Sequence, residues 1–196
     1  FKLSENELIV ANTGRPIEAD DLTALCTMSY TTKSLGSENK ASIGHKGRGF
    51  SSVLEITENP KIYSKGISFE FNRSKSKEDI YSLINSLDNE EISALNGIPL
   101  MRLPYNLEHT PDNIKTLYQK GYNTVFLFPL KNDRVKKDII AAVNRLDNNT
   151  ILFLNNLEKL KIKINKDKIK KWNISKQSKE ILDTDTSLDY ITINKD

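Results

Sequence analysis

Two periodicities of hydrophobic and polar positions divide the chain into predicted strands and helices. Short segments in which apolar residues alternate with polar ones, or run together, indicate strands. Segments in which apolar residues recur every three or four positions predict helices. The predicted strands lie at residues 1–3, 8–11, 61–64, 67–72, 124–130, 160–164, 168–174 and 188–194, and the predicted helices at 20–28, 51–57, 77–88, 111–120, 133–147 and 151–154.

Turn and cap residues sharpen several of these boundaries. A polar turn at residues 4–7 predicts a hairpin over the first twelve residues, and Lys65-Gly66 predicts a second hairpin. Ser76 is a candidate N-cap for one helix, and Pro111 occupies a plausible first helical position in the next. Residues 29–43 are polar and lack an apolar period, which predicts a long mobile loop; such loops in compact domains are usually either functional or disordered.

The mixture of elements predicts an α/β fold, built as an α+β two-layer sandwich in which helices cover one face of a mixed sheet. The last forty residues are β-rich and lysine-rich. We therefore predict one domain over residues 1–157 and an extension, or the start of a following domain, over 158–196. Alternating Lys and Ile is typical of a strand with one solvated face, and the same lysines also suit contacts to nucleic-acid phosphates.

Composition narrows the classes of protein. The chain has 196 residues, with 29 Lys and Arg against 26 Asp and Glu, a net charge of +3. This balance excludes a histone-like tail. No apolar run approaches the roughly 20 residues of a membrane helix, and the polar start argues against a secretory signal. The single cysteine, Cys26, excludes an intrachain disulfide, and we expect it in the core. We therefore expect a cytoplasmic protein with no membrane partner.

A glycine-rich loop carries the strongest chemical signal. Gly44, Gly47 and Gly49 precede a predicted helix, and Lys46 and Arg48 add positive charge. Backbone amides at a helix N-terminus bind anions, and glycines let a phosphate approach the main chain. The spacing differs from the P-loop and from the Rossmann fingerprint, so taken alone the motif also fits an ordinary glycine-rich turn.

The order of motifs around this loop resembles the Bergerat (GHKL) ATP-binding fold of gyrase B, the ninety-kilodalton heat-shock chaperones, histidine kinases and MutL. The resemblance is strongest to the branch that includes sacsin and plant no-vein-like proteins. It rests on the Asn12 to Pro16 turn, on Ile43-Gly44-His45-Lys46-Gly47-Arg48-Gly49-Phe50, and on the strand from Thr124 to Leu130. It covers about residues 1–157.

The resemblance implies roles for individual residues. Asn12 matches the adenine-contacting residue, which is Asp in most of the superfamily, and Gly14 matches the glycine against which the ring packs. Thr124 matches the strand threonine of the adenine-side network; it is also an ordinary β-branched strand residue. Lys33 and Ser34 match lid residues near the phosphates. The implied phosphate-binding loop consists of Gly44, His45, Lys46, Gly47, Arg48, Gly49 and Phe50.

The hydrolytic half of the family motif is not visible in this chain. In the family, a helix before the first strand carries a Glu that activates water and an Asn that binds Mg²⁺. Here Glu5, Asn6 and Glu7 lie in a predicted turn, and we do not assign them those roles. We expect a longer parent protein to supply this helix upstream of Phe1. The resemblance implies an ATPase that uses ATP and Mg²⁺ in that parent.

Three functional hypotheses remain open at this point. The first is an ATP-binding module of a larger, chaperone-like or DNA- and defence-associated ATPase, in which closure of the lid reports nucleotide state to other domains and a homodimer is possible. The second is a nucleic-acid-binding module that uses the basic C-terminal strands and no nucleotide chemistry. The third is an interaction scaffold that has lost ATP, for which Asn12 in place of Asp is the support.

Overall fold

The computed structural model describes residues 1–27, 50–83, 100–152, 157–165, 168–180 and 187–195. The chain divides into two compact units, each described here by itself. The middle unit is Asn6–Asn132, and the terminal unit combines Phe1–Glu5 with Asp133–Asp196. These units divide the chain at a different place from the predicted domain boundary near residue 157, which stays a prediction.

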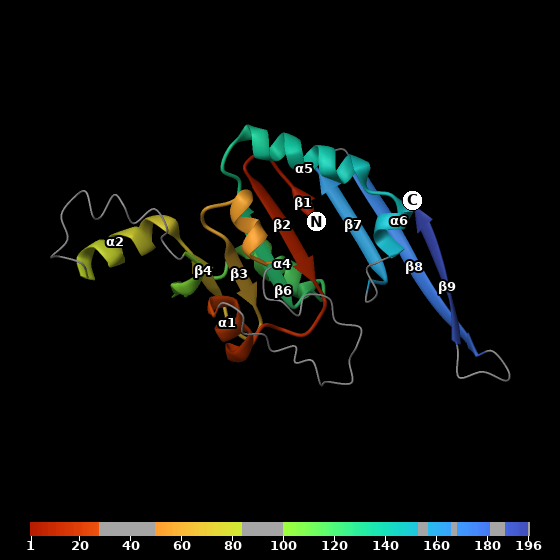
Figure 1. Ribbon diagram of the computed structural model, residues 1–196, viewed down its shortest axis with the longest axis horizontal. Coiled ribbons are helices and arrows are strands. Elements are labelled where there is room, and N and C mark those ends of the chain that lie inside the picture. Colours follow the sequence, from red (N-terminus) through yellow and green to blue (C-terminus); the bar gives the residue numbers. More distant parts are fainter. Residues whose placement is uncertain (28–49, 84–99, 153–156, 166–167, 181–186, 196) are drawn as a thin grey trace. The chain divides into compact units, whose positions relative to one another are not determined.

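The middle unit contains an antiparallel sheet in the strand order β5-β4-β3-β6-β2. Figure 1 shows the strands and helices of this unit. The strands are β2 (Glu7–Asn12), β3 (Lys61–Ser64), β4 (Phe69–Phe71), β5 (Pro104–Asn106) and β6 (Thr124–Pro129). The helices are α1 (Ala19–Cys26), α2 (Arg73–Leu83), α4 (Asp112–Gln119) and the 3₁₀ helices η1 (Phe50–Glu55) and η2 (Leu100–Arg102).

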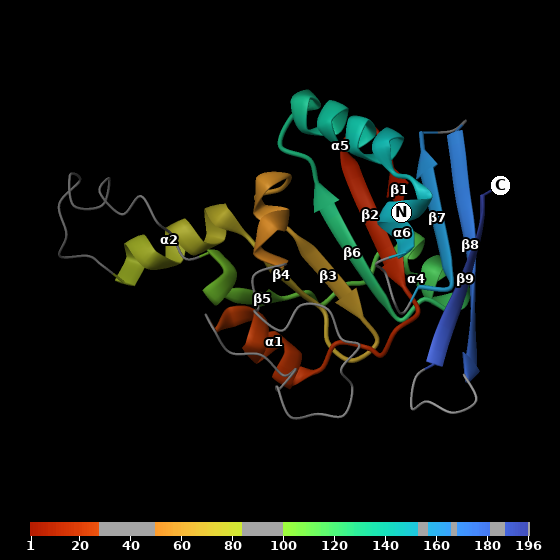
Figure 2. The same cartoon turned by 45° about the vertical axis from the view of Figure 1, so that its right-hand side comes forward.

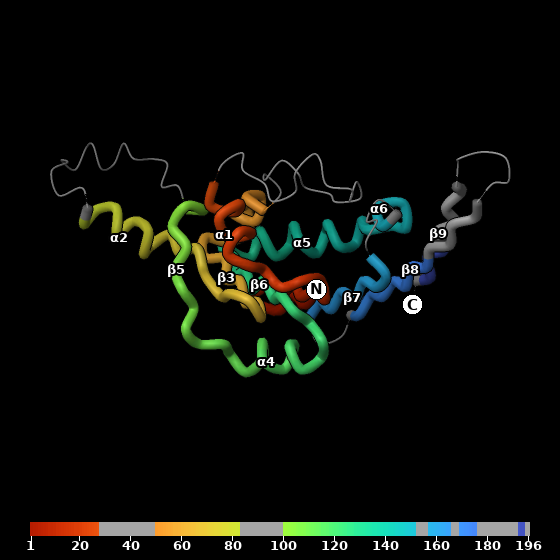
Figure 3. The backbone as a smooth tube through the Cα atoms, turned by 90° about the horizontal axis from the view of Figure 1, so that it is seen from below, coloured from red at the N-terminus to blue at the C-terminus, as the bar shows by residue number. Residues whose placement is uncertain are grey.

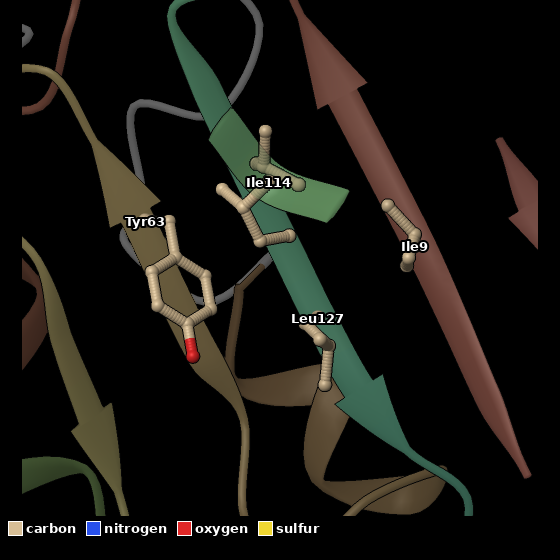
Figure 4. Close-up of a cluster of buried hydrophobic side chains, with 5 residues drawn as sticks. Ile9, Tyr63, Ile114 and Leu127 are labelled. Carbon is tan, nitrogen blue, oxygen red and sulfur yellow. The ribbon is translucent and has the colours of Figure 1, made fainter. Parts of the chain in front are cut away.

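Helices cover both faces of this sheet. On one face, Ile114 of α4 packs against Ile9, Tyr63 and Leu127 (Figure 4). On the other face, α1, η1 and η2 pack against the side chains of Ile62 and its neighbours. Figure 3 shows α1 and α4 on opposite sides of β3 and β6. The expectation that helices cover one face only is therefore wrong for this unit, because successive strand residues point to opposite faces and here both sets are apolar.

The terminal unit contains the strands β1 (Lys2–Leu3), β7 (Lys159–Ile164), β8 (Lys168–Glu180) and β9 (Ser187–Lys195), in that order (Figure 2). The β1–β7 pair is parallel and the other two pairs are antiparallel. Its helices are α5 (Asp133–Arg145) and α6 (Asn148–Leu152). The inner face of its sheet is apolar, with buried Leu3, Leu160, Ile162, Ile164, Trp172 and Ile174.

Some predicted boundaries move for identifiable reasons. Helix α2 begins at Arg73, because the Asn72 side chain accepts a hydrogen bond from the Lys75 backbone N–H at 3.2 Å and caps the helix. The predicted cap, Ser76, is instead fully buried within the helix.

Cys26 is half-buried against the core, where burial raises the pKa of its thiol. None of the described helices is long and apolar enough to cross a bilayer.

Candidate functional site

Three polar side chains lie in a row across the middle sheet. Asn12 of β2 is the register partner of Thr124 of β6, and Thr124 is the register partner of Ser64 of β3. Directly opposed residues of antiparallel strands share a face. This face also carries Phe126, which packs in the cluster covered by α1 and η1. We call Asn12, Thr124 and Ser64 the polar row.

The two inner members of the polar row are buried and hydrogen-bonded. Thr124 is 1% exposed and Ser64 is 6% exposed, and their hydroxyl oxygens lie 3.3 Å apart. The backbone N–H of Ile17 donates a hydrogen bond to the Ser64 hydroxyl at 2.8 Å. Such partners offset the cost of burying hydroxyl groups. Asn12 is exposed, so the row presents an amide to solvent and backs it with two fixed hydroxyls.

Asn123 fixes the turn that follows Asn12. Its side-chain amide donates hydrogen bonds to the carbonyl oxygens of Thr13 at 3.1 Å and Gly14 at 3.0 Å. Its backbone N–H donates to the Asn12 carbonyl at 2.9 Å, and its carbonyl accepts from the Lys65 N–H at 3.1 Å. Asn123 therefore ties three segments of the site together. Sequence reasoning missed this residue, although an asparagine just before the strand is a turn signal.

Gly66 permits a close approach between two backbones beside the row. A Cβ atom at Gly66 would lie 2.4 Å from the carbonyl oxygen of Ile17. A side chain there would displace the 15–17 segment and with it the Ile17 N–H that donates to Ser64. Glycine at this position therefore serves the packing of the site rather than the conformation of the turn alone.

The segment between the Asn12 turn and α1 is also held in place. Both terminal nitrogens of the Arg15 guanidinium donate hydrogen bonds of 2.6 Å to the Asp21 carboxylate. The hydrogen bond and charge of Asp21 raise the pKa of Arg15. The same carboxylate accepts from the Glu18 backbone N–H at 3.0 Å, which completes a capping box at the start of α1.

The structure brings together the three residues that sequence analysis assigned to adenine. Asn12 and Thr124 are register partners, and the Cβ position at Gly14 lies 3.5 Å from the Asn12 Oδ1 atom. Phe50, the last residue of the predicted phosphate-binding loop, begins η1. Its ring lies 5.7 Å from that of Phe126, on the same face as the polar row.

The remaining predicted site residues lie outside the described residues. These are Lys33 and Ser34 of the predicted lid, and Gly44, His45, Lys46, Gly47, Arg48 and Gly49 of the predicted phosphate-binding loop. Their roles stay predictions. Within the described ranges, no group of three or more His, Cys, Asp or Glu side chains is placed to hold a metal ion. Of the predicted site, the described residues therefore contain the three predicted adenine-contacting positions and Phe50.

A second polar cluster lies away from the polar row, around Glu70 of β4. Glu70 is 4% exposed, and its carboxylate lies 2.9 Å from the ammonium of Lys75 and 3.5 Å from that of Lys61. Burial by itself raises the pKa of Glu70, but the hydrogen bonds from Lys75 and Asn72 and the two lysine charges outweigh it and hold the pKa below its ordinary value. Because the buried carboxylate depends on these lysine partners, removing one of them should destabilise the fold.

Comparison with known proteins gives one distant similarity. The chain is 27% identical over 162 residues to Protein NO VEIN of Arabidopsis thaliana. The match covers 81% of this chain and 5% of that protein, so the chain spans only a small part of its relative. No family model matches the chain, and no solved structure matches it. The comparisons therefore support a distant, partial similarity to a plant no-vein protein, and the Bergerat fold stays a prediction.

Proposed function

We propose that the middle unit is an ATP-binding module that recognises adenine at the exposed end of the polar row. The observation that carries this proposal is the register pairing of Asn12 with Thr124. These two residues are distant in sequence, and the resemblance assigns both to adenine. The distant similarity to Protein NO VEIN also supports the proposal, because the motifs resemble the branch that includes plant no-vein-like proteins.

The chemistry of the row suits a purine with an amino group next to a ring acceptor. The Asn12 carbonyl oxygen accepts from the exocyclic amine of adenine, while its amide group donates to the neighbouring ring nitrogen. Thr124 lies beside Asn12 on the same face, and its buried hydroxyl, hydrogen-bonded to that of Ser64, supports the base-contacting amide from behind. Gly14 leaves the side of the Asn12 amide clear for the ring, because it carries no Cβ atom.

The phosphate half of the proposal rests on the resemblance and on the position of Phe50. The amides of the 44–49 loop would bind the polyphosphate where the loop meets η1, with Lys46 and Arg48 adding charge. In the parent protein, the proposal extends to ATP hydrolysis with Mg²⁺ bound upstream, to closure of a lid through Lys33 and Ser34, and to control of other domains. The chaperone-like or defence-associated output and a homodimer belong to this same proposal.

Isothermal titration of the 196-residue chain with a non-hydrolysable ATP analogue tests adenine recognition. Asn12→Ala removes both hydrogen bonds to the base, and we expect at least a tenfold loss of affinity, which corresponds to about 1.4 kcal/mol. Asn106→Ala, an exposed asparagine on β5 of the same sheet, is the matched control and should bind as the natural chain does.

Two results would contradict the proposal. The first is an absence of binding both in this chain and in a longer protein that includes the residues before Phe1. The second is binding that Asn12→Ala leaves unchanged. The first result would favour the scaffold hypothesis, and the second would mean that Asn12 does not contact the base. Asn12→Asp separates the two hydrogen bonds, because a carboxylate accepts from the adenine amine and cannot donate to the ring nitrogen.

A further inference from the structure

The outward face of the terminal sheet carries a group of lysines that the proposed ATP site does not use. We call it the lysine face. Four of its members are exposed and Lys163 is half-exposed. They come from three adjacent strands: Lys2 of β1, Lys159, Lys161 and Lys163 of β7, and Lys171 of β8.

Strand register sets four of these five lysines directly opposite one another in two pairs. Lys2 is the register partner of Lys163, and Lys161 is the register partner of Lys171. Neighbouring strands lie about 4.8 Å apart, and alternate residues of one strand are separated by about 6.7 Å. Like charges opposed at this spacing destabilise a sheet. The fold therefore tolerates a repulsion that a bound polyanion would relieve.

Apart from Glu158, which lines a hollow beside Lys159, the described neighbours on this face are uncharged. Ile169, Asn173 and Ser175 of β8 and Asn194 of β9 occupy outward positions, and all four are neutral. The whole chain has a net charge of +3. Without these five lysines the net charge of the chain would be −2. The lysine face is therefore a local concentration of positive charge in a chain that is otherwise slightly acidic.

Lys170, in the same strand as Lys171, has a structural role and lies on the opposite face of the sheet. It pairs in register with the buried Ile162 and therefore lies on the inner face. Its ammonium donates 3.1 Å hydrogen bonds to the Val143 carbonyl and to the Asn144 side chain, both on α5. In the described part of the chain, no ion pair or hydrogen bond holds the ammonium groups of Lys161 and Lys171, so these remain available to a ligand.

A hollow lies at one end of the lysine face. Its volume is about 370 Å³, and its polar lining comes from Lys159, Asn173, Ser175, Asn194 and Glu158. Side-chain amides and hydroxyls beside lysines are the groups with which proteins contact the phosphates, sugars and base edges of nucleic acids.

We propose that the lysine face binds double-stranded nucleic acid through its phosphate backbone, without reading sequence. Along β7 the lysines span about 13 Å, and a duplex presents about eight phosphate charges over that length of axis, enough for five ammonium groups. Single-strand binding relies on aromatic stacking platforms, and the described outward positions of β7 and β8 offer no aromatic side chain. Membrane binding needs a broad apolar face, whereas the neutral neighbours are mostly polar.

Fluorescence anisotropy with a labelled 24-base-pair duplex tests the proposal at several salt concentrations. Binding through n lysine–phosphate contacts gives a slope of log affinity against log salt of about −0.9 per contact, thus up to about −4.5 for five. The double variant Lys161→Ala with Lys171→Ala should bind at least tenfold more weakly and reduce the magnitude of that slope by about two.

The matched control is the double variant Lys77→Ala with Lys120→Ala, which removes the same charge from exposed positions of the middle unit. It should leave affinity and slope unchanged, as should Asn12→Ala, so this proposal and ATP binding fail or succeed separately. Circular dichroism verifies that each variant is folded. The proposal is overturned by an absence of duplex binding at 50 mM salt, by an unchanged slope in the lysine variant, or by tighter binding to a single strand or to phosphatidylserine vesicles.

Discussion

The polar row and the lysine face are two solutions to the placement of polar side chains on a sheet. In both, strand register brings residues from adjacent strands into direct opposition. In the polar row, Thr124 and Ser64 are neutral, buried and hydrogen-bonded to each other. In the lysine face, Lys161 and Lys171 carry like charges and remain exposed.

The difference teaches which polar groups serve the fold and which are left for a ligand. A buried hydroxyl that loses its partner costs about 1–3 kcal/mol, so the inner polar row is part of the core. An exposed lysine opposite another contributes nothing favourable to its sheet. The first arrangement predicts a loss of stability on truncation, and the second predicts a small gain.

The largest expected effect concerns the apolar side that backs the lysine face. Trp172 is fully buried on the inner face of β8, and Trp172→Ala should lower the free energy of unfolding by about 3–5 kcal/mol. Ile169→Ala changes a residue that is 47% exposed on the same strand and opposite face; its effect should stay within about 0.5 kcal/mol. Urea denaturation measures both. Equal losses would break the distinction between the two faces of this sheet.

The next effect concerns the hydroxyl pair of the polar row. Ser64→Ala leaves the Ile17 N–H and the Thr124 hydroxyl without their partner, and we expect a loss of about 1–3 kcal/mol. Thr124→Val keeps the shape of its side chain and should cost less. In a double-mutant cycle the two losses should not add, since both changes remove one shared hydrogen bond. Simple additivity in denaturation experiments would show that the hydroxyls do not interact.

Glu70 supplies a third arrangement, in which two lysines are paired with a buried acid. The pKa of Glu70 is lowered from its ordinary value of 4.5, so the folded state favours the ionised form. This contribution is fully present above that value and is lost as pH falls through the lower, folded pKa. Glu70→Gln should therefore be less stable at pH 7, with the deficit shrinking below about pH 4.5. A deficit independent of pH, measured by urea denaturation, would contradict this account.

The smallest expected effect is a gain. Lys161→Ala with Lys171→Ala removes a directly opposed pair of like charges and should raise stability by a few tenths of a kcal/mol at low salt. The gain should fade as added salt screens the repulsion in the natural chain. Thermal denaturation at 20 mM and 500 mM salt measures both. A loss of stability at low salt would mean that these lysines support the sheet and would remove the contrast with the polar row.

Much of the secondary structure was predictable because it follows local periodicity. The strict alternation of residues 160–164 became β7, and the apolar run that starts at Thr124 became β6. Helix α2 was misplaced because its cap, Asn72, acts together with Asn59, whose side chain accepts from the Arg73 N–H at 3.2 Å. That hydrogen bond joins residues 14 positions apart, so no local sequence pattern predicts it.

The candidate site was partly predictable for a different reason. Asn12, Gly14 and Thr124 were chosen by resemblance to a family, and the fold places them together. Ser64 and Asn123 were not chosen, since a serine at a strand end and an asparagine in a turn have many ordinary explanations. Their importance comes from hydrogen bonds to residues far along the chain.

The sequence by itself determined the alternation that separates apolar from charged faces, the α/β mixture and the residue types available for chemistry. Only the tertiary structure decided which of these residues meet. A two-residue side-chain period assigns each residue to a face but does not specify its partner on the next strand. Register between distant segments made Asn12 the neighbour of Thr124 and Lys161 the neighbour of Lys171, because pairing depends on the packing of whole strands.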